Sequence, residues 1–177
     1  MEIFAETDRL LMREIVEDDA AALFEMDSDP EVHRYLGNNP LKTPDQAKEM
    51  IAFIRDQYNN FGIGRWTVIE KTTNNFIGWA GLKFRQDRVN GFDHFYDLGY
   101  RFRRISWGKG YATEASLATL HYGFDKLNLP VIYAMAEVSN NASNKVLLKS
   151  GMQLINCFEF EHIAHNWYQL EKQNWKR

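Results

Sequence analysis

The sequence predicts one domain of the mixed α/β class. Two observations predict it. Segments with apolar residues at helical spacing alternate with short, β-rich segments, and no repeat, low-complexity tract or Pro/Gly-rich linker divides the chain. The length of 177 residues fits one compact domain with its own hydrophobic core. We therefore expect residues 1–177 to fold as a single unit.

The first 40 residues predict one strand and two short helices. Arg9–Ile15 is expected to form the strand, and residues 17–26 the first helix. The second helix is expected over residues 30–36, because Pro30 suits a first helical position and Gly37 suits the residue just past a helix end.

The next segment predicts a longer helix followed by a β-hairpin. Thr43 and Gln46 have the spacing of a capping box, and the apolar residues behind them recur at helical spacing. Two β-rich stretches, Gly64–Lys71 and Phe76–Arg85, flank the turn residues Thr72–Asn75. We expect these two strands to pair in antiparallel orientation.

The second half predicts strands that alternate with helices. Phe95–Arg103 is a further strand, and a long helix follows the glycines after it. Val131–Val138 is short and nearly all apolar, as expected of a strand buried on both faces. Asn140 can cap a helix that runs to Lys149. The chain is then expected to close with two strands, near Met152–Phe160 and Trp167–Lys172.

Composition excludes several classes of protein. A formal charge of −3 and a pI near 6.0 argue against nucleic-acid binding through bulk charge. Cys157 is the single cysteine, so no internal disulfide forms, and no Cys/His spacing suits zinc; no metal is expected. In its apolar strand Cys157 is expected to be a small buried residue rather than a nucleophile. The sequence has no signal peptide or membrane-span pattern, so a cytoplasmic protein is expected.

Arg103–Thr113 (RRISWGKGYAT) is the segment with the strongest chemical signal. A strand ends there, a loop with Gly108 and Gly110 follows, and a helix begins. Glycines allow close approach of a ligand, and the free N–H groups of a helix N-terminus attract anions, so the geometry suits a pyrophosphate. Three basic residues add positive charge: Arg103, Arg104 and Lys109. The alternative is an ordinary strand–helix connection with glycines for tight packing.

Two nucleotide-binding motifs do not match this segment. A Walker A loop needs Ser or Thr after its lysine, where this chain has Gly110. A Rossmann fingerprint needs a third glycine where the chain has Thr113. The ligand is therefore not expected to sit in either of those loops.

Five short motifs follow one another along almost the whole chain, from near Thr7 to about Leu170. They are TDRLLMREI (7–15), DLGY (97–100), WGKGYATEA (107–115), NNAS (140–143) and KSGM (149–152). In order and spacing the motifs resemble the GNAT N-acetyltransferase superfamily, and most closely its branch of ribosomal-protein N-terminal (alanine/serine) acetyltransferases. The resemblance implies an α+β fold with a mixed, mostly antiparallel sheet of about seven strands. Helices flank that sheet, which is splayed between its fourth and fifth strands.

The resemblance also implies binding of acetyl-CoA. The family pattern Gln/Arg-x-x-Gly-x-Gly/Ala places its glycines at Gly108 and Gly110, and Ile105 departs from its first position. The pantetheine arm would run beside Phe102–Arg104 like an added strand, with the Asn140 region across the cleft. The implied cofactor-binding residues are Phe102, Arg103, Arg104, Trp107, Gly108, Lys109, Gly110, Tyr111, Ala112, Thr113, Asn140 and Ser143.

Two residues are candidates for proton transfer. The resemblance points to Asp97 as a general base that acts through water, and the alternative is a strand-face acid in a salt bridge. Many relatives protonate the leaving thiolate with a tyrosine, whose position here is Leu147. Ser143 is the nearest substitute for that acid, and its alternative is a helix-start hydroxyl that satisfies backbone amides.

The expected function is acetyl transfer from acetyl-CoA to a primary amine by direct attack in a ternary complex. The acceptor is a peptide N-terminus or a small molecule, and the helices before Asn60 and the loop Gln86–His94 would shape its pocket. Two alternatives stay open: a CoA-binding module with little catalysis, and an interaction domain without a cofactor. The protein is expected to be a monomer or a homodimer.

Overall fold

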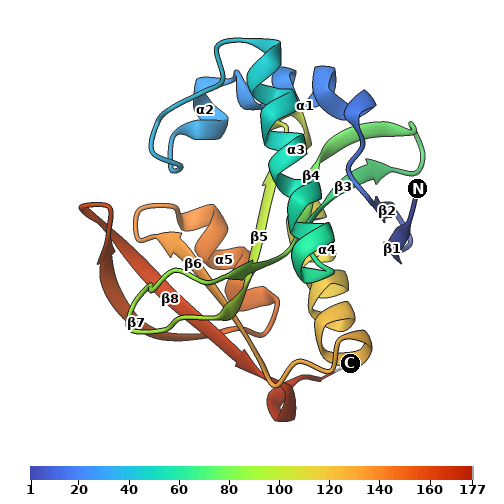
Figure 1. Cartoon of the computed structure of the whole chain (residues 1–177). Helices are drawn as coiled ribbons and strands as arrows, with labels where there is room; N and C mark the ends of the chain where they lie inside the picture. The colour runs from blue at the N-terminus through green and yellow to red at the C-terminus, as the bar shows by residue number, and fades with distance from the viewer. Residues whose placement is uncertain (177) are drawn as a thin grey trace.

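The structure, a computed structural model that describes residues 1–176, is built on one sheet with helices on both faces (Figure 1). The strand order is β1-β2-β3-β4-β5-β6-β8-β7. The strands are β1 (Ile3–Glu6), β2 (Leu10–Arg13), β3 (Arg65–Glu70), β4 (Asn75–Arg85), β5 (Phe95–Phe102), β6 (Val131–Glu137), β7 (Gln153–Phe160) and β8 (Ile163–Glu171). Neighbouring strands pair antiparallel except β5 and β6, which are parallel.

Helices α1 to α3 cover one face of the sheet, and α4 and α5 cover the other. Their bounds are α1 (Ala20–Asp27), α2 (Pro30–His33), α3 (Pro44–Phe61), α4 (Tyr111–His121) and α5 (Asn141–Lys149). Short 3₁₀ turns precede α1 and α4, and a π-helical turn, Tyr122–Lys126, extends α4. Among residues 1–176, no helix is long and apolar enough to cross a membrane.

The predicted starts of α2, α3 and α5 are confirmed, because the side chains named in the sequence make the capping bonds, whereas α1, expected from residue 17, begins at Ala20 after a 3₁₀ turn. The Oδ1 of Asp29 accepts from the N–H of Glu31 at 3.0 Å, and Asn140 Oδ1 accepts from the N–H of Ser143 at 3.1 Å. At α3, Gln46 Oε1 accepts from the N–H of Thr43 at 3.1 Å, which is the return bond of the capping box.

Two expectations about strands differ from the structure. The four-residue β1 was not predicted, so the sheet has eight strands instead of about seven, whereas the expected splay lies between the same two segments, β5 and β6, which form the parallel pair. An exposed edge strand of this length carries too few residues for a readable period. The expectation that Cys157 is buried is wrong: it is exposed, because β7 is the other edge of the sheet and presents most of its side chains to solvent.

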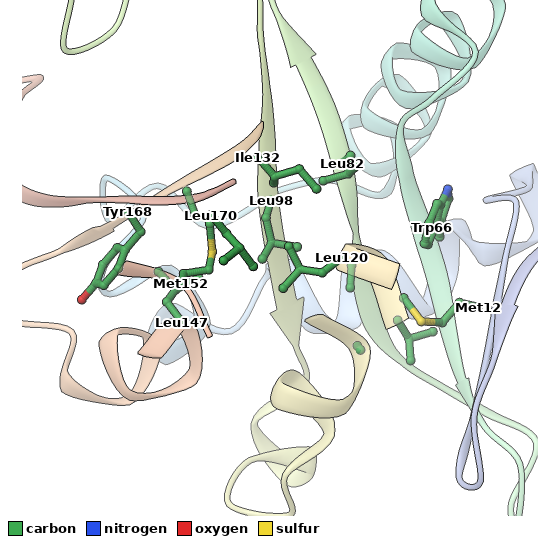
Figure 2. Packing of buried hydrophobic residues seen from close by; sticks show 14 of the residues in the cluster. Met12, Trp66, Leu82, Leu98, Leu120, Ile132, Leu147, Met152, Tyr168 and Leu170 are labelled. Carbon is green, nitrogen blue, oxygen red and sulfur yellow. The ribbon is translucent and has the colours of Figure 1, made fainter. Parts of the chain in front are cut away.

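The main hydrophobic core lies between the sheet and α4 and α5. Figure 2 shows it running from Met12 and Trp66 on one side to Tyr168 and Leu170 on the other. Leu147 is 2% exposed and belongs to this core. A second core, under α1 to α3, fills the opposite face. Since both faces are packed, the sheet holds the loops at its strand ends in fixed positions.

The sheet opens at its parallel junction. β5 and β6 are paired at one register position, Asp97 opposite Tyr133, and then diverge (Figure 1). β5 stays paired with β4 along its whole length on the other side. The half of β5 beyond Asp97 therefore has no paired strand on its β6 side, and we call this unpaired stretch between β5 and β6 the gap.

Candidate functional site

The loop between β5 and α4 has the conformation that its two glycines allow. Gly108 has φ 73° and Gly110 has φ 81°, both in the left-handed region that disfavours other residues. Gly110 is the residue that immediately precedes α4. A Cβ on Gly108 would meet open space, so backbone conformation, not crowding, requires glycine there.

The loop presents a row of free backbone N–H groups. Within the part of the chain that the structure describes, the N–H groups of residues 108–113 donate no hydrogen bond, and that of Glu114 is the first to bond, to Gly110 O at 3.1 Å. They lie at the start of the 11-residue α4, where the helix dipole places partial positive charge. These groups fit the phosphates of a nucleotide-like cofactor.

The backbone of Tyr100 faces the gap between β5 and β6. The N–H of Arg103 donates to the carbonyl of Ile77 on β4 at 2.9 Å, and backbone groups alternate in direction along an antiparallel strand. The N–H and C=O of Tyr100 therefore point away from β4. A linear amide chain placed in the gap would find this unpaired edge of β5 available for hydrogen bonding.

The side chain of Tyr100 bridges β5 and α5. Its hydroxyl lies 2.9 Å from the hydroxyl of Ser143 and also donates to the carbonyl of Ser143 at 3.1 Å. Burial raises the pKa of Tyr100, and the hydrogen bond with Ser143 opposes that shift only in part. The sequence reasoning singled out Ser143 but missed Tyr100, although it lies in the DLGY motif.

The arginines at the end of β5 are paired with acids of the first two helices. Arg101 Nη1 lies 2.8 Å from Asp27 Oδ2. The two following arginines form similar pairs, Arg103 with Glu25 and Arg104 with Asp29, the latter at 3.1 Å. The side chains of Arg103 and Arg104 were expected at a pyrophosphate, whereas the structure shows them turned toward α1 and α2.

Arg9 joins the N-terminal strands to the glycine loop. Its Nη1 donates to the carbonyl of Lys109 at 2.9 Å, its Nε donates to Glu114 Oε2 at 2.6 Å, and its guanidinium lies 4.6 Å from the centre of the Tyr111 ring. The hydroxyl of Tyr111 donates to Glu70. The sequence assigned no role to Arg9, because the contact joins residues 100 positions apart.

Two exposed apolar side chains border the same loop. Trp107 is 48% exposed, and its Nε1 donates to the carbonyl of Phe102 at 2.9 Å. Ile105, the residue that departs from the family pattern, is 75% exposed. Both side chains are thus free to contact a bound molecule without rearrangement of the core.

Asp97 is paired with a buried arginine of β3. Arg65 Nη2 donates to Asp97 Oδ2 at 2.7 Å, and its Nη1 donates to the carbonyl of Asp97 at 2.7 Å. A Cβ at Gly99 would lie 2.4 Å from Arg65 Nη2, so a larger residue would displace the guanidinium. The salt-bridge alternative for Asp97 is therefore present in the structure, and its role as a base stays a prediction.

A pocket of about 380 Å³ lies on the opposite face of the sheet from α4. It is bounded by the second half of α3 and by the end of β4, with Gln86 and Asp87 of the following loop at its edge. Of the segments expected to shape an acceptor pocket, α3 and the first two residues of the loop Gln86–His94 line this one, and its use as an acceptor site stays a prediction.

The family model for the acetyltransferase (GNAT) domain matches residues 9–153. The uncharacterized N-acetyltransferase p20 of Bacillus licheniformis is 38% identical over 141 residues, which cover 80% of this chain and 77% of that protein. This chain therefore belongs to the GNAT acetyltransferase family, a family of acetyl-transferring enzymes.

Solved structures agree with the fold. The acetyltransferase (GNAT family) from Bacillus anthracis superposes with a TM-score of 0.80 at 27% identity, covering 98% of this chain and 99% of that one. The ribosomal L7/L12 α-N-protein acetyltransferase, solved in complex with coenzyme A, gives a TM-score of 0.80 at 16% identity over 96% of this chain and 98% of that chain. At that identity the second likeness concerns the fold alone.

Proposed function

We propose that this protein transfers an acetyl group from acetyl-CoA to a primary amine by direct attack in a ternary complex. The observation that carries the proposal is the row of free N–H groups at residues 108–113 beside the gap between β5 and β6. A pyrophosphate on the loop and an amide-bearing arm in the gap would together use both features. When bound, acetyl-CoA supplies the acetyl group as a thioester, so that an N–C bond forms, the C–S bond breaks, the amine loses a proton and the thiolate gains one.

The backbone holds the cofactor in this proposal. The N–H groups of 108–113 bind the phosphates, and the N–H and C=O of Tyr100 pair with the amides of the arm. Trp107 and Ile105 contact its exposed parts. Lys109 adds charge at the loop, whereas Arg103 and Arg104 contribute through their backbone while their side chains hold α1 and α2.

Ser143 is proposed to supply the proton that the leaving group needs. It lies at the start of α5, across the gap from β5, and the hydroxyl of Tyr100 fixes its position at 2.9 Å. Leu147 stands where many relatives hold a tyrosine, and its hydrocarbon side chain offers no acid. Asp97 is proposed as the base that removes a proton from the amine through water.

One observation favours a second candidate, a CoA-binding module with little catalysis. Asp97 is tied to Arg65 and Leu147 carries no hydroxyl, so neither the base nor the usual acid is free. In this second case cofactor binding is retained and turnover is lost.

A thiol-release assay with acetyl-CoA separates the candidates. Peptides with free N-termini and small amines serve as acceptors, and thermal unfolding with and without acetyl-CoA measures binding. Turnover of at least one acceptor supports the enzyme. A thermal shift without turnover across the whole panel supports the module, and the absence of both contradicts the placement of the cofactor.

A further inference from the structure

The pocket between α3 and β4 contains a lysine without a counter-ion. Lys83 is half-buried, and within residues 1–176 its Nζ forms no salt bridge; the nearest ring, that of Phe53, has its centre 5.2 Å away. Burial lowers the pKa of Lys83, the cations of Arg65 and Arg85 lower it further, and Asp97 and Asp87 oppose the shift.

The two carboxylates whose charge acts on Lys83, Asp97 and Asp87, are already paired with other cations. Asp97 pairs with Arg65 at 2.7 Å and Asp87 pairs with Arg85 at 2.5 Å. The three basic side chains on β3 and β4 therefore face two carboxylates, which leaves one positive charge at the pocket floor. Two further carboxylates, Asp56 at the rim and Glu161 of the β7–β8 turn, also place negative charge near the pocket. Both are exposed, so water and salt screen their charge.

A second polar group in the pocket has no partner. Gln57 of α3 is 5% exposed, and its buried Oε1 accepts no hydrogen bond from any described residue. A buried acceptor without a donor costs free energy unless a ligand or water satisfies it. The pocket therefore offers one cationic donor and one acceptor to a ligand.

The pocket lies next to the gap in which acetyl transfer is proposed. Lys83 is directly opposite Asp97 in the β4–β5 register, and Asp97 is the residue at which β5 and β6 are still paired. Directly opposite side chains project to one face of a sheet, here the face covered by α1 to α3. The glycine loop begins α4 on the other face, so the two substrates would approach the gap from opposite sides.

We propose that this pocket binds the anionic group of a small primary amine, a carboxylate or a phosphate, through the ammonium group of Lys83. The Oε1 of Gln57 accepts a hydrogen bond from an N–H of the same molecule. The pocket volume of about 380 Å³ suits an amino acid or an amine of similar size. A polyamine is disfavoured, because one of its ammonium groups would meet the unpaired ammonium group of Lys83. The proposal rests on the proposed acetyl transfer and names its acceptor class.

The test compares acceptors that differ only in the anionic group. Free amino acids against their carboxamides, and phosphoethanolamine against ethanolamine, are assayed by thiol release at saturating acetyl-CoA. The wild type is expected to favour at least one anionic amine by about 10- to 100-fold in kcat/KM, the size of a charge-assisted hydrogen bond. Whichever pair shows the preference identifies carboxylate or phosphate.

Variants assign the preference to Lys83. In Lys83→Gln the preference for the anionic amine should fall to about threefold or less, because the KM for that amine rises. Lys83→Arg should restore part of the preference. Lys48→Gln is the matched control, because Lys48 lies on α3 and pairs with Asp45 at the surface. An equal response to both members of every pair, or a preference that survives Lys83→Gln, overturns the proposal.

Failure of acetyl transfer itself gives a different result. If no amine is acetylated, the proposed function fails, and calorimetric titration of the anionic amines still tests the pocket. Binding that Lys83→Gln weakens at least tenfold then supports the pocket, and binding that is absent or unchanged in the variant overturns it.

Discussion

The hydroxyl groups of Tyr100 and Ser143 lie 2.9 Å apart, although the two residues come from β5 and α5 on either side of the gap in the sheet. The contact orients the serine hydroxyl within hydrogen-bonding reach of a group bound between the two elements. A tyrosine thus lies close to the proposed position of the leaving group. It comes from β5, whereas the tyrosine of many relatives would come from α5.

Removal of the tyrosine hydroxyl should slow acetyl transfer. We expect Tyr100→Phe to lower kcat by roughly tenfold, the cost of one hydrogen bond, and Ser143→Ala by about 100-fold, the size of a lost general acid. Because burial raises the pKa of Tyr100, its hydroxyl stays protonated from pH 6 to 9, and the loss should be constant over this range. Tyr168→Phe is the control, since it removes a hydroxyl that bonds to the neighbouring Asn144. A Tyr100→Phe enzyme with the kcat of the wild type would contradict the assignment.

The left-handed glycines should be required for cofactor binding. Gly110→Ala places a side chain at φ 81° and should cost about 1–2 kcal/mol locally, and Gly110→Trp should abolish the thermal shift with acetyl-CoA. Gly151→Ala is a matched control, because Gly151 has φ 87° and open space around it but lies after α5. Tight acetyl-CoA binding by Gly110→Trp would place the cofactor elsewhere.

Variants of Arg65 and Asp97 can separate the structural role of Asp97 from its proposed catalytic role. Asp97→Asn leaves the buried guanidinium without its carboxylate and should destabilise the fold by about 3–5 kcal/mol, measured by urea denaturation. In the double variant Arg65→Met/Asp97→Asn both charges are gone, and stability should largely return. If Asp97 is the base, kcat/KM stays at least tenfold low in that variant. Recovery of both quantities together would assign Asp97 a structural role alone.

His33 should make stability depend on pH. Burial lowers the pKa of His33, and Arg101 lowers it further, while Asp27 opposes the shift. The unfolded chain therefore binds the proton more readily, so stability is full above pH of about 6.5 and falls as the pH drops through the folded-state pKa. We expect His33→Gln to flatten the dependence of the free energy of unfolding between pH 7.5 and 5. The fully exposed His162 serves as a control: His162→Gln should keep the wild-type slope, and an identical slope in His33→Gln would exclude His33 as its source.

Local sequence patterns were sufficient for most elements and for the glycine loop. Caps such as Asn140 act through hydrogen bonds to residues three positions away, so a helix start can be predicted from a short stretch of sequence. The same holds for Gly108 and Gly110, because a positive φ is a property of a single residue. The short edge strand β1 was missed, and the exposure of Cys157 on β7 was misjudged, since edge position depends on strand order.

The partners of the site residues were decided by tertiary structure alone. Arg103 pairs with Glu25, Arg65 with Asp97 and Tyr100 with Ser143, across separations of 78, 32 and 43 residues. No local pattern encodes such pairs, because they depend on strand register and on which face of the sheet each helix covers. The sequence by itself identified the loop proposed to bind a pyrophosphate, since such a site requires only glycines and helix N–H groups. Packing decided which charges are already paired, and among the described residues it left Lys83 without a salt bridge in the pocket between α3 and β4.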